Sequence, residues 1–171
     1  MAETATYYFN SYDEGGEEWA TNPENMVDGN TGNSSSTNDD ADVELLLTNT
    51  CDGTNLGTIS VVEVRCYCQI SGGGPSRIDL VPVFGGSDDG DTHIIAPGFS
   101  GAWSSYVDIT DDTNAPEDWD WDDVKDLDID MGVEINASAV LCSRVEVRVT
   151  YTPGGADPVY RKIMTTNSLF W

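Results

Sequence analysis

Residues 143–151 read Ser-Arg-Val-Glu-Val-Arg-Val-Thr-Tyr, and this stretch decides the fold class. Its apolar side chains fall on every second residue, because Val145, Val147 and Val149 alternate with glutamate, arginine and threonine. Successive side chains of a β-strand point to opposite faces, so this spacing makes one face apolar and the other polar. The stretch therefore predicts an antiparallel strand that covers a core on one side and meets solvent on the other.

The same alternation extends through most of the chain. It recurs in residues 43–47, 58–70, 78–84, 103–110 and 129–135. Stretches rich in Gly and Asn separate these segments at residues 28–33, 71–75 and 85–91, and supply the backbone angles that tight turns need. Many short strands with regular turns predict an all-β fold, a jelly-roll β-sandwich of about eight antiparallel strands. We assign this domain to residues 1–152.

One short helical turn is expected between the strands. Asp120 is placed to cap its N-terminus, and Asp123 follows three residues later in the capping-box position. Trp121, Val124 and Leu127 recur every third residue, as the apolar side of a short helix requires. The acidic residues at its start also suit the positive end of the helix dipole.

The chain is strongly acidic, with 31 Asp plus Glu against 7 Lys plus Arg and a formal net charge of -24. Self-repulsion of this size opposes compaction at low ionic strength, and salt relieves it by screening. Such carboxylate-rich, lysine-poor surfaces are typical of halophiles; a solvated acidic face or a cluster of cation sites is the alternative. Both interpretations argue against nucleic acid as a partner, because its phosphates would be repelled. No stretch approaches the roughly 20 apolar residues of a membrane span, so we expect no membrane insertion.

The four cysteines are Cys51, Cys66, Cys68 and Cys142. Cys66 and Cys68 lie two apart in a predicted strand, so both point to the same face as its valines, which is the core side. We interpret them as buried free thiols, with disulfides from this pair to Cys51 and Cys142 as the alternative. The paired spacings of a zinc ribbon are missing, which argues against a zinc site.

Residues 119–133 read Trp-Asp-Trp-Asp-Asp-Val-Lys-Asp-Leu-Asp-Ile-Asp-Met-Gly-Val and precede the valine-rich stretch that ends in Val-Thr-Tyr. This order resembles the closing part of a jelly-roll domain that is common in structural proteins of tailed bacterial and archaeal viruses. Asp120 stands where those proteins usually have Thr or Ser, and it is still a competent cap. The resemblance covers about the last third of the domain. Its structural motif consists here of Trp119, Trp121, Val124 and Leu127.

Residues 19–31 are similar to a second pattern, the Asn-x-x-Asp-Gly-Asn-x-x-Thr opening of discoidin-like and galactose-binding-like jelly rolls. In many such domains this loop helps to hold a structural calcium ion. The resemblance implies that Asp28 and Asn30 supply oxygen ligands and that backbone carbonyls complete the shell. The alternative is a hydrogen-bonded Asx turn without a metal. We expect no cofactor other than Ca²⁺ or another structural cation.

Catalysis has little support in the sequence. His93 is the only histidine, and no nucleophile elbow, metal-binding His pair or phosphate loop is found. A hydrolase that uses a Glu–Asp pair trails the other interpretations, and we expect no enzymatic activity. The tryptophans would suit a sugar platform, but we interpret Trp103 and Trp121 as core residues and Trp119 as covering a sheet edge.

Residues 153–158 read Pro-Gly-Gly-Ala-Asp-Pro and predict a linker, so that residues 153–171 form a linker and a C-terminal docking arm. Large apolar side chains are poorly placed in water, which favours docking of this arm on a neighbour. The arm residues are Tyr160, Ile163, Met164, Leu169, Phe170 and Trp171.

Together these features predict a non-enzymatic structural protein of a virus particle from a halophilic system: a capsid decoration, turret, fibre or tail component. We expect a homo-oligomer that assembles with other virion proteins through its sheet faces and C-terminal arm. Residues 1–10 lack the basic start and apolar run of a secretory signal, which fits release by lysis. The alternative is a secreted or cell-surface carbohydrate-binding or adhesin module, or an extracellular filament subunit. A host surface glycan would then be a partner.

Overall fold

The computed structural model describes residues 1–13, 19, 21–39, 43–136 and 138–154. Its elements are β1 (Glu3–Tyr12), the 3-10 helix η1 (Pro23–Met26), β2 (Ser35–Thr37), β3 (Val43–Asn49), β4 (Gly57–Ile70), β5 (Arg77–Phe84), β6 (Asp88–Asp89), β7 (His93–Ile95), β8 (Ala102–Trp103), β9 (Val107–Asp108), α1 (Trp121–Lys125), β10 (Asp128–Glu134) and β11 (Val140–Pro153).

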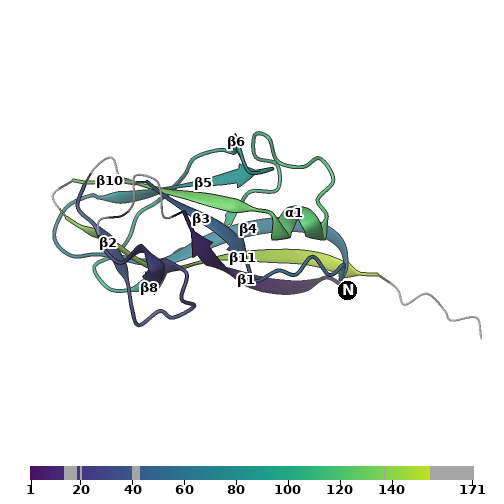
Figure 1. Ribbon diagram of the computed structural model, residues 1–171, viewed down its shortest axis with the longest axis horizontal. Coiled ribbons are helices and arrows are strands. Elements are labelled where there is room, and N and C mark those ends of the chain that lie inside the picture. The colour runs from purple at the N-terminus through teal and green to yellow at the C-terminus, as the bar shows by residue number, and fades with distance from the viewer. Residues whose placement is uncertain (14–18, 20, 40–42, 137, 155–171) are drawn as a thin grey trace, which may run out of the picture.

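The strands form two antiparallel sheets in facing layers, with α1 at one end (Figure 1). In sheet A the order is β1-β11-β4, and the short β8 and β9 pair with the outer edge of β4. In sheet B the order is β1-β3-β10-β5, and β6 and β7 pair with the outer edge of β5. The short β2 pairs with the start of β11. If β2 is set aside and β6 with β7 and β8 with β9 each count as one interrupted strand, the remaining eight strands follow the order of a jelly roll. The predicted fold class is confirmed.

Strand β1 belongs to both sheets. Its first part pairs with β11, where Glu3 lies opposite Tyr151, and its last part pairs with β3, where Phe9 lies opposite Asn49. Phe9 is fully buried where the strand passes from one sheet to the other. The aliphatic alternation that predicts the other strands is missing here, because the inward residues before Phe9 are alanine and tyrosine. The pattern of the sequence therefore does not predict this strand.

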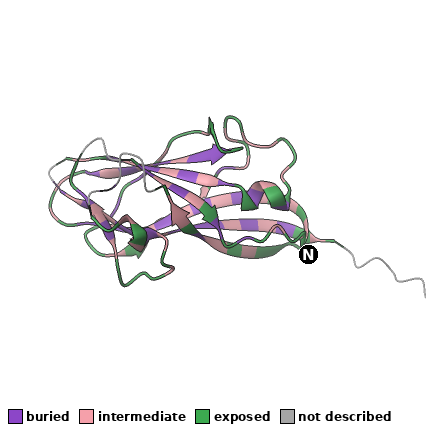
Figure 2. Cartoon of the chain, viewed as in Figure 1, coloured by how far each residue is buried: buried purple, intermediate pink, exposed green. Residues whose placement is uncertain are grey.

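The core lies between the sheets, and buried and less buried residues alternate along the long strands (Figure 2). The inward valines of β11, Val145, Val147 and Val149, are fully buried, as the opening stretch predicted. All four cysteines are buried free thiols, which was the favoured interpretation. Burial raises the pKa of Cys51, which keeps its thiol protonated and unreactive.

Strand β3 has the opposite phase from the one that its apolar residues suggest. Leu46 and Glu44 point inward, and the carboxylate of Glu44 accepts a hydrogen bond from the backbone N–H of Trp19 at 3.2 Å. Pairing with β10 sets this phase, since Leu46 lies opposite Ile129, and a slip of one residue would invert it. Three apolar side chains are thereby placed on the outer face of sheet B: Val43, Leu45 and Leu47.

The predicted strand over residues 103–110 is interrupted. Within this stretch only the short β8 and β9 pair with β4, and between them the hydroxyl of Ser104 accepts a hydrogen bond from the backbone N–H of Cys66 at 3.2 Å. The interpretation of Trp103 as a core residue is wrong, because its half-buried ring lies on the outer face of sheet A, opposite Tyr67 on β4. The break in the strand also frees Tyr106 to turn over that face.

Helix α1 forms where the sequence predicted a helical turn, and its capping box is complete. The carboxylate of Asp120 accepts hydrogen bonds from the backbone N–H groups of Asp122 and Asp123, at 2.8 and 2.9 Å. In return, the carboxylate of Asp123 accepts one from the N–H of Asp120 at 2.8 Å. These bonds satisfy N–H groups that the first helical turn leaves unpaired.

Buried side chains attach α1 to the end of the sandwich. Trp121, Val124 and Leu127 are at most 2% exposed, and the indole N–H of Trp121 donates to the carbonyl of Gly57 at 2.8 Å. Gly57 has a φ of 146°, and a Cβ there would collide with the carbonyl oxygen of Thr152. Only glycine fits this start of β4.

The sandwich extends slightly beyond the predicted boundary at residue 152. Pro153 is the last residue of β11, and the N–H of Gly154 donates to the carbonyl of Leu56 at 3.4 Å. In the part of the chain that the structure describes, no helix has the length and apolar character needed to cross a membrane. The predicted arm residues lie outside the described residues: Tyr160, Ile163, Met164, Leu169, Phe170 and Trp171.

Candidate functional site on the outer sheet faces

The outer face of sheet A carries a buried carboxylate, that of Glu146 in the middle of β11, which is only 4% exposed. Arg65 lies opposite it on β4, and its Nε and Nη2 atoms are 2.7 and 2.6 Å from Glu146 Oε1. The hydroxyl of Tyr106 donates to the same oxygen at 2.7 Å. A guanidinium and a phenol therefore neutralise and hydrogen-bond this carboxylate, which makes its burial tolerable.

Tyr106 lies at the centre of this arrangement. The guanidinium carbons of Arg65 and Arg148 are 4.2 and 3.7 Å from its ring centroid, in the geometry of cation–π contacts. Arg148 also donates two hydrogen bonds to Glu63, at 2.8 and 2.9 Å. Burial raises the pKa of Tyr106, and the neighbouring carboxylate of Glu146 raises it further. We name these five residues, Glu63, Arg65, Tyr106, Glu146 and Arg148, the A-face cluster.

The predicted calcium loop lies beside sheet A and forms consecutive Asx turns. Asp28 accepts hydrogen bonds from the backbone N–H of Asn30 at 2.7 Å and from the amide of Asn33 at 3.1 Å. The carbonyl of Gly29 accepts a hydrogen bond from Arg144 at 2.9 Å, which places a positive charge beside the turn. Among the described residues, no group of three or more His, Cys, Asp or Glu side chains is arranged to hold a metal ion. A calcium ion at Asp28 and Asn30 stays a prediction.

The outer face of sheet B has a different composition. Asp128 and Asp130 point outward from β10 and are half-buried. Asp130 lies between Leu45 of β3 and Val81 of β5 in the strand register. Leu47 also points outward, two residues after Leu45, and the next residue, Thr48, donates its backbone N–H to Asp128. We name these five residues, Leu45, Leu47, Val81, Asp128 and Asp130, the B-face patch.

The two carboxylates of the B-face patch resist ionisation. Burial raises the pKa of Asp130, and the negative charges of Asp89 and Asp128 raise it further. Burial also raises the pKa of Asp128, although its carboxylate accepts a hydrogen bond from the backbone N–H of Thr48 at 3.1 Å. No ion pair within the described ranges joins either carboxylate to a cation.

The B-face patch continues into a hollow of about 350 Å³ next to Asp128. The lining residues are Thr48, Gly85, Gly86, Asp126 and Asp128. The two glycines leave the hollow open, and its two carboxylates give it negative charge. Its chemistry suits a cationic side chain better than an apolar or anionic group.

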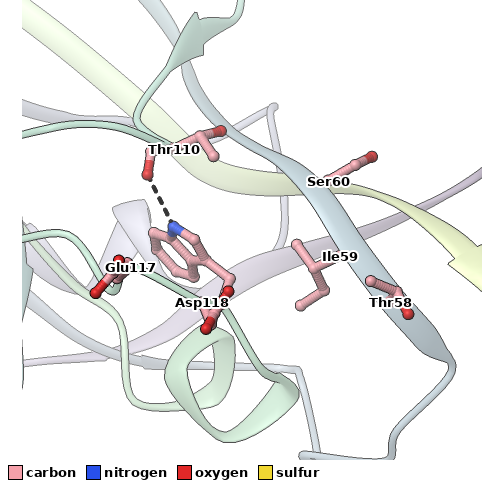
Figure 3. A pocket seen from close by; sticks show the side chains of 7 residues that line it. Thr58, Ile59, Ser60, Thr110, Glu117 and Asp118 are labelled. Atoms are coloured by element: carbon pink, nitrogen blue, oxygen red, sulfur yellow. Dashed lines mark hydrogen bonds between the residues drawn. The ribbon is translucent and has the colours of Figure 1, made fainter.

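A second hollow, of about 260 Å³, lies at the outer edge of β4 (Figure 3). The indole N–H of Trp119 donates to the carbonyl of Thr110 across it at 3.0 Å. Its serine, Ser60, donates its hydroxyl to a backbone carbonyl of β11, and both carboxylates are exposed. The hollow therefore offers no nucleophile paired with a base. The lining residues are Thr58, Ile59, Ser60, Thr110, Glu117, Asp118 and Trp119.

The single histidine stabilises a loop. His93 Nε2 lies 2.7 Å from a carboxylate oxygen of Asp112, which connects β7 to the turn after β9. Among the described residues His93 has no hydroxyl or thiol partner, so this pair lacks the third member of a nucleophilic triad.

The motif residues that follow the viral pattern gather at the α1 end of the sandwich. Trp121, Val124 and Leu127 enter the core, whereas Trp119 is half-buried and packs edge-to-face on Phe84 at 5.8 Å between ring centroids. They lie far from both Asp28 and Asn30 in the sequence. The motif thus shapes one end of the fold and contributes no reactive group.

The A-face cluster was not predicted from the sequence, although part of its pattern is present there. Arg144, Glu146 and Arg148 alternate with the valines that identify β11, and Glu63 and Arg65 alternate in the same way on β4. Opposite charges on the outward faces of two long strands suggest cross-strand pairs once the strands are known to be neighbours. The pairing of β4 with β11, and the turn that places Tyr106 over them, are known only from the fold.

Comparison with known proteins adds a distant structural similarity and no sequence match. No protein-family model matches the chain, and no curated protein sequence matches it. Among solved structures, a family two carbohydrate esterase from Cellvibrio japonicus is similar with a TM-score of 0.38 and 12% sequence identity. The similarity covers 91% of this chain and 37% of that one, so the chain spans well under half the length of the esterase. At this level it carries no argument about activity.

Proposed function

We propose that the protein is a non-enzymatic structural subunit of a virus particle from a halophilic system. It serves as a capsid decoration, turret, fibre or tail component and forms a homo-oligomer that also contacts other virion proteins. The observation that carries the proposal is the B-face patch, where Leu45, Leu47 and Val81 point outward around half-buried carboxylates. Outward apolar side chains on a flat sheet are typical of a surface that another protein covers.

Two further features support this proposal. The strand order is that of a jelly roll, and Trp119, Trp121, Val124 and Leu127 close one end of it in the order of the viral pattern. The acidic composition suits concentrated salt, because the formal charge of -24 is screened there. Fold alone does not define function, so the proposal depends on the surface and on its test.

The proposal is tested in two steps. Sedimentation velocity of the purified chain over a range of protein concentrations should show association into a defined oligomer. Antibodies raised against the chain should then label intact particles that are released by lysis of the host, in immunogold electron micrographs. A chain that stays monomeric at every concentration and labels no particle would contradict the proposal.

A carbohydrate-binding or adhesin module on the cell surface is the second candidate. The observation in its favour is Trp103, whose ring lies on the outer face of sheet A and packs edge-to-face with Tyr67 at 5.4 Å. However, the guanidinium of Arg65 lies 4.2 Å from the centroid of the same ring and covers part of it. Glycan-array binding that is lost in Trp103→Ala would favour this candidate over the first one.

Calcium binding at Asp28 and Asn30 belongs to the proposal as a stabilising element. Chelation with EDTA should then lower the melting temperature of the wild type, and Asp28→Ala should remove the difference between chelated and calcium-loaded protein. The variant Asp39→Ala, at another exposed aspartate of the same N-terminal region, is the control. Equal melting temperatures of the wild type with and without calcium would contradict a bound ion.

A further inference from the structure

We propose that residues 159–164 of one copy bind to the B-face patch of a second copy, with Arg161 and Lys162 against its carboxylates. This inference rests on the proposed function in one respect, that the chain associates with itself. The inference specifies which two surfaces of the protein contact each other, and the proposed function does not specify them. The interface is heterologous, since one segment of each copy meets a different surface of the next.

The receiving surface combines apolar and anionic groups. Leu45 and Val81 flank Asp130 on the neighbouring strands, and Leu47 points outward two residues after Leu45. Gly132 follows on the same face of β10, where a Cβ would be 3.5 Å from the carbonyl oxygen of Asp79. Because Gly132 has no side chain, the outer surface of sheet B is shallower there than at the neighbouring residues. A segment of chain can therefore lie along β10.

The carboxylates of this surface have no cationic partner in the described part of the chain. Both of them, Asp128 and Asp130, are half-buried. The hollow that Asp126 and Asp128 share has room for a long basic side chain at the end of the patch. A guanidinium or ammonium group placed here would be partly desolvated, which strengthens its attraction to the carboxylates.

The sequence has few basic residues, and this identifies the segment that binds to the B-face patch. The chain has 7 basic residues, and the five in the described part all have carboxylate partners. The other two are Arg161 and Lys162, which are adjacent in the sequence and follow Tyr160. Ile163 and Met164 come next, so two basic residues are flanked by apolar ones. This composition complements a surface of leucine, valine and aspartate.

We assign the segment to a second copy because it continues from the other sheet, and the mixing experiment below tests this assignment. Gly154 continues β11, which belongs to sheet A, whereas the B-face patch lies on the far side of sheet B. Within one molecule the chain would have to pass around the α1 end of the sandwich, where Asp122 and Asp126 lie, before it reached the patch. The seven residues from Gly154 to Arg161 span up to about 25 Å when fully extended, which sets the reach of the segment.

The test is a charge exchange in the full-length chain. Asp130→Lys should weaken self-association in sedimentation velocity by about tenfold or more, and so should the double variant Arg161→Asp with Lys162→Asp. The control Asp111→Lys introduces the same charge change at an exposed turn and should leave association unchanged. Thermal unfolding and circular dichroism establish that each variant is folded. If Asp130→Lys does not fold, Asp128→Lys, at the rim of the hollow, takes its place.

Mixing the two variants distinguishes one copy from two. Each variant has one altered and one intact surface, so an equimolar mixture should associate again, because each segment then meets a surface of opposite charge. Binding within one chain predicts no recovery on mixing, and that result would overturn the proposal. It is also overturned if Asp130→Lys and Asp111→Lys associate like the wild type. The proposed function is tested separately, by the labelling of intact particles.

Discussion

The two outer faces of the sandwich arise from the same alternation of side chains, and they differ in how their charges are balanced. On sheet A, the buried carboxylate of Glu146 is paired with Arg65 and Tyr106, and Glu63 is paired with Arg148. On sheet B, Asp130 is half-buried between apolar neighbours without a cation in the described part of the chain. Partial burial of an unpaired carboxylate costs free energy, whereas burial of a paired one need not.

This difference between the two faces shows where the few basic residues of this acidic chain lie. Of the five arginines in the sequence, three lie on the outer face of sheet A. Two of them, Arg65 and Arg148, form cross-strand pairs that hold β4 and β11 together, so the A-face cluster is already complete within one molecule. The B-face patch has the opposite character, because it gains most from contact with another molecule.

The largest effect is expected from Glu146→Ala, which breaks the A-face cluster. Arg65 would keep its charge and lose its partner, so the free energy of unfolding should fall by about 3 kcal/mol in urea titrations. The control Glu134→Ala removes an exposed partner of Arg77 and should cost less than about 1 kcal/mol. Equal losses in both variants would mean that the cluster is no more than a surface ion pair.

Salt should act on the whole molecule and most strongly on the unpaired face. Raising NaCl from about 0.1 M to about 2 M should increase the free energy of unfolding by about 2 kcal/mol, because screening removes self-repulsion. The double variant Asp128→Asn with Asp130→Asn should gain less, since part of that repulsion is already gone. Thermal unfolding across salt concentrations measures both. A wild type that is insensitive to salt would argue against a halophilic origin.

Acidification should stabilise the protein through the B-face patch. Since Asp128 and Asp130 have raised pKa values, the folded state binds protons more readily than the unfolded state, where the value is 3.8. Their contribution to stability is fully present below the unfolded pKa and is lost as pH rises through the folded pKa. Lowering the pH from neutral towards the unfolded pKa should therefore raise the free energy of unfolding.

The control for acidification is the matched double variant Asp111→Asn with Asp118→Asn, at two exposed positions in the loop before α1. It should keep the gain in stability, whereas the double variant of the B-face patch should lose most of it in urea titrations at neutral and at lower pH. The same gain in both variants would show that the general negative charge, and not this patch, responds to protons.

The smallest effect is expected from Tyr106→Phe. The ring would still lie against Arg65 and Arg148, while the hydrogen bond from the hydroxyl to Glu146 would be lost. One hydrogen bond to a carboxylate that keeps its arginine should contribute about 1 kcal/mol, measured as the shift in urea midpoint. Tyr106→Ala should cost more, because it also removes both cation–π contacts. Identical losses would assign all of the stabilisation to the hydroxyl.

The sequence predicted the strands whose own residues determine their faces. In β4 and β11 the aliphatic residues are regular and numerous, so that periodicity alone gave the inward side correctly. The capping box of α1 was predictable for the same reason, since Asp120 and Asp123 act within one turn of chain. Local chemistry was sufficient in each of these elements.

The rest depends on contacts between residues far apart in the chain. The phase of β3 is set by its pairing with β10, and Glu44 is turned inward against the hydrophobic pattern of its own strand. The position of Trp103 follows from a break in the strand that only its neighbours create. The B-face patch follows from the unexpected phase of β3, and the pattern of a single strand could not have revealed it.

The first strand has a consequence for how the protein is made. Glu3 pairs with Tyr151, so the opening residues of a nascent chain have no partner in sheet A until almost the whole domain has left the ribosome. Contacts of such large sequence separation also slow folding, because a long loop must close before they form. Until then, the growing chain exposes an unpaired strand edge, which favours aggregation. Repulsion between the many carboxylates of the chain opposes it.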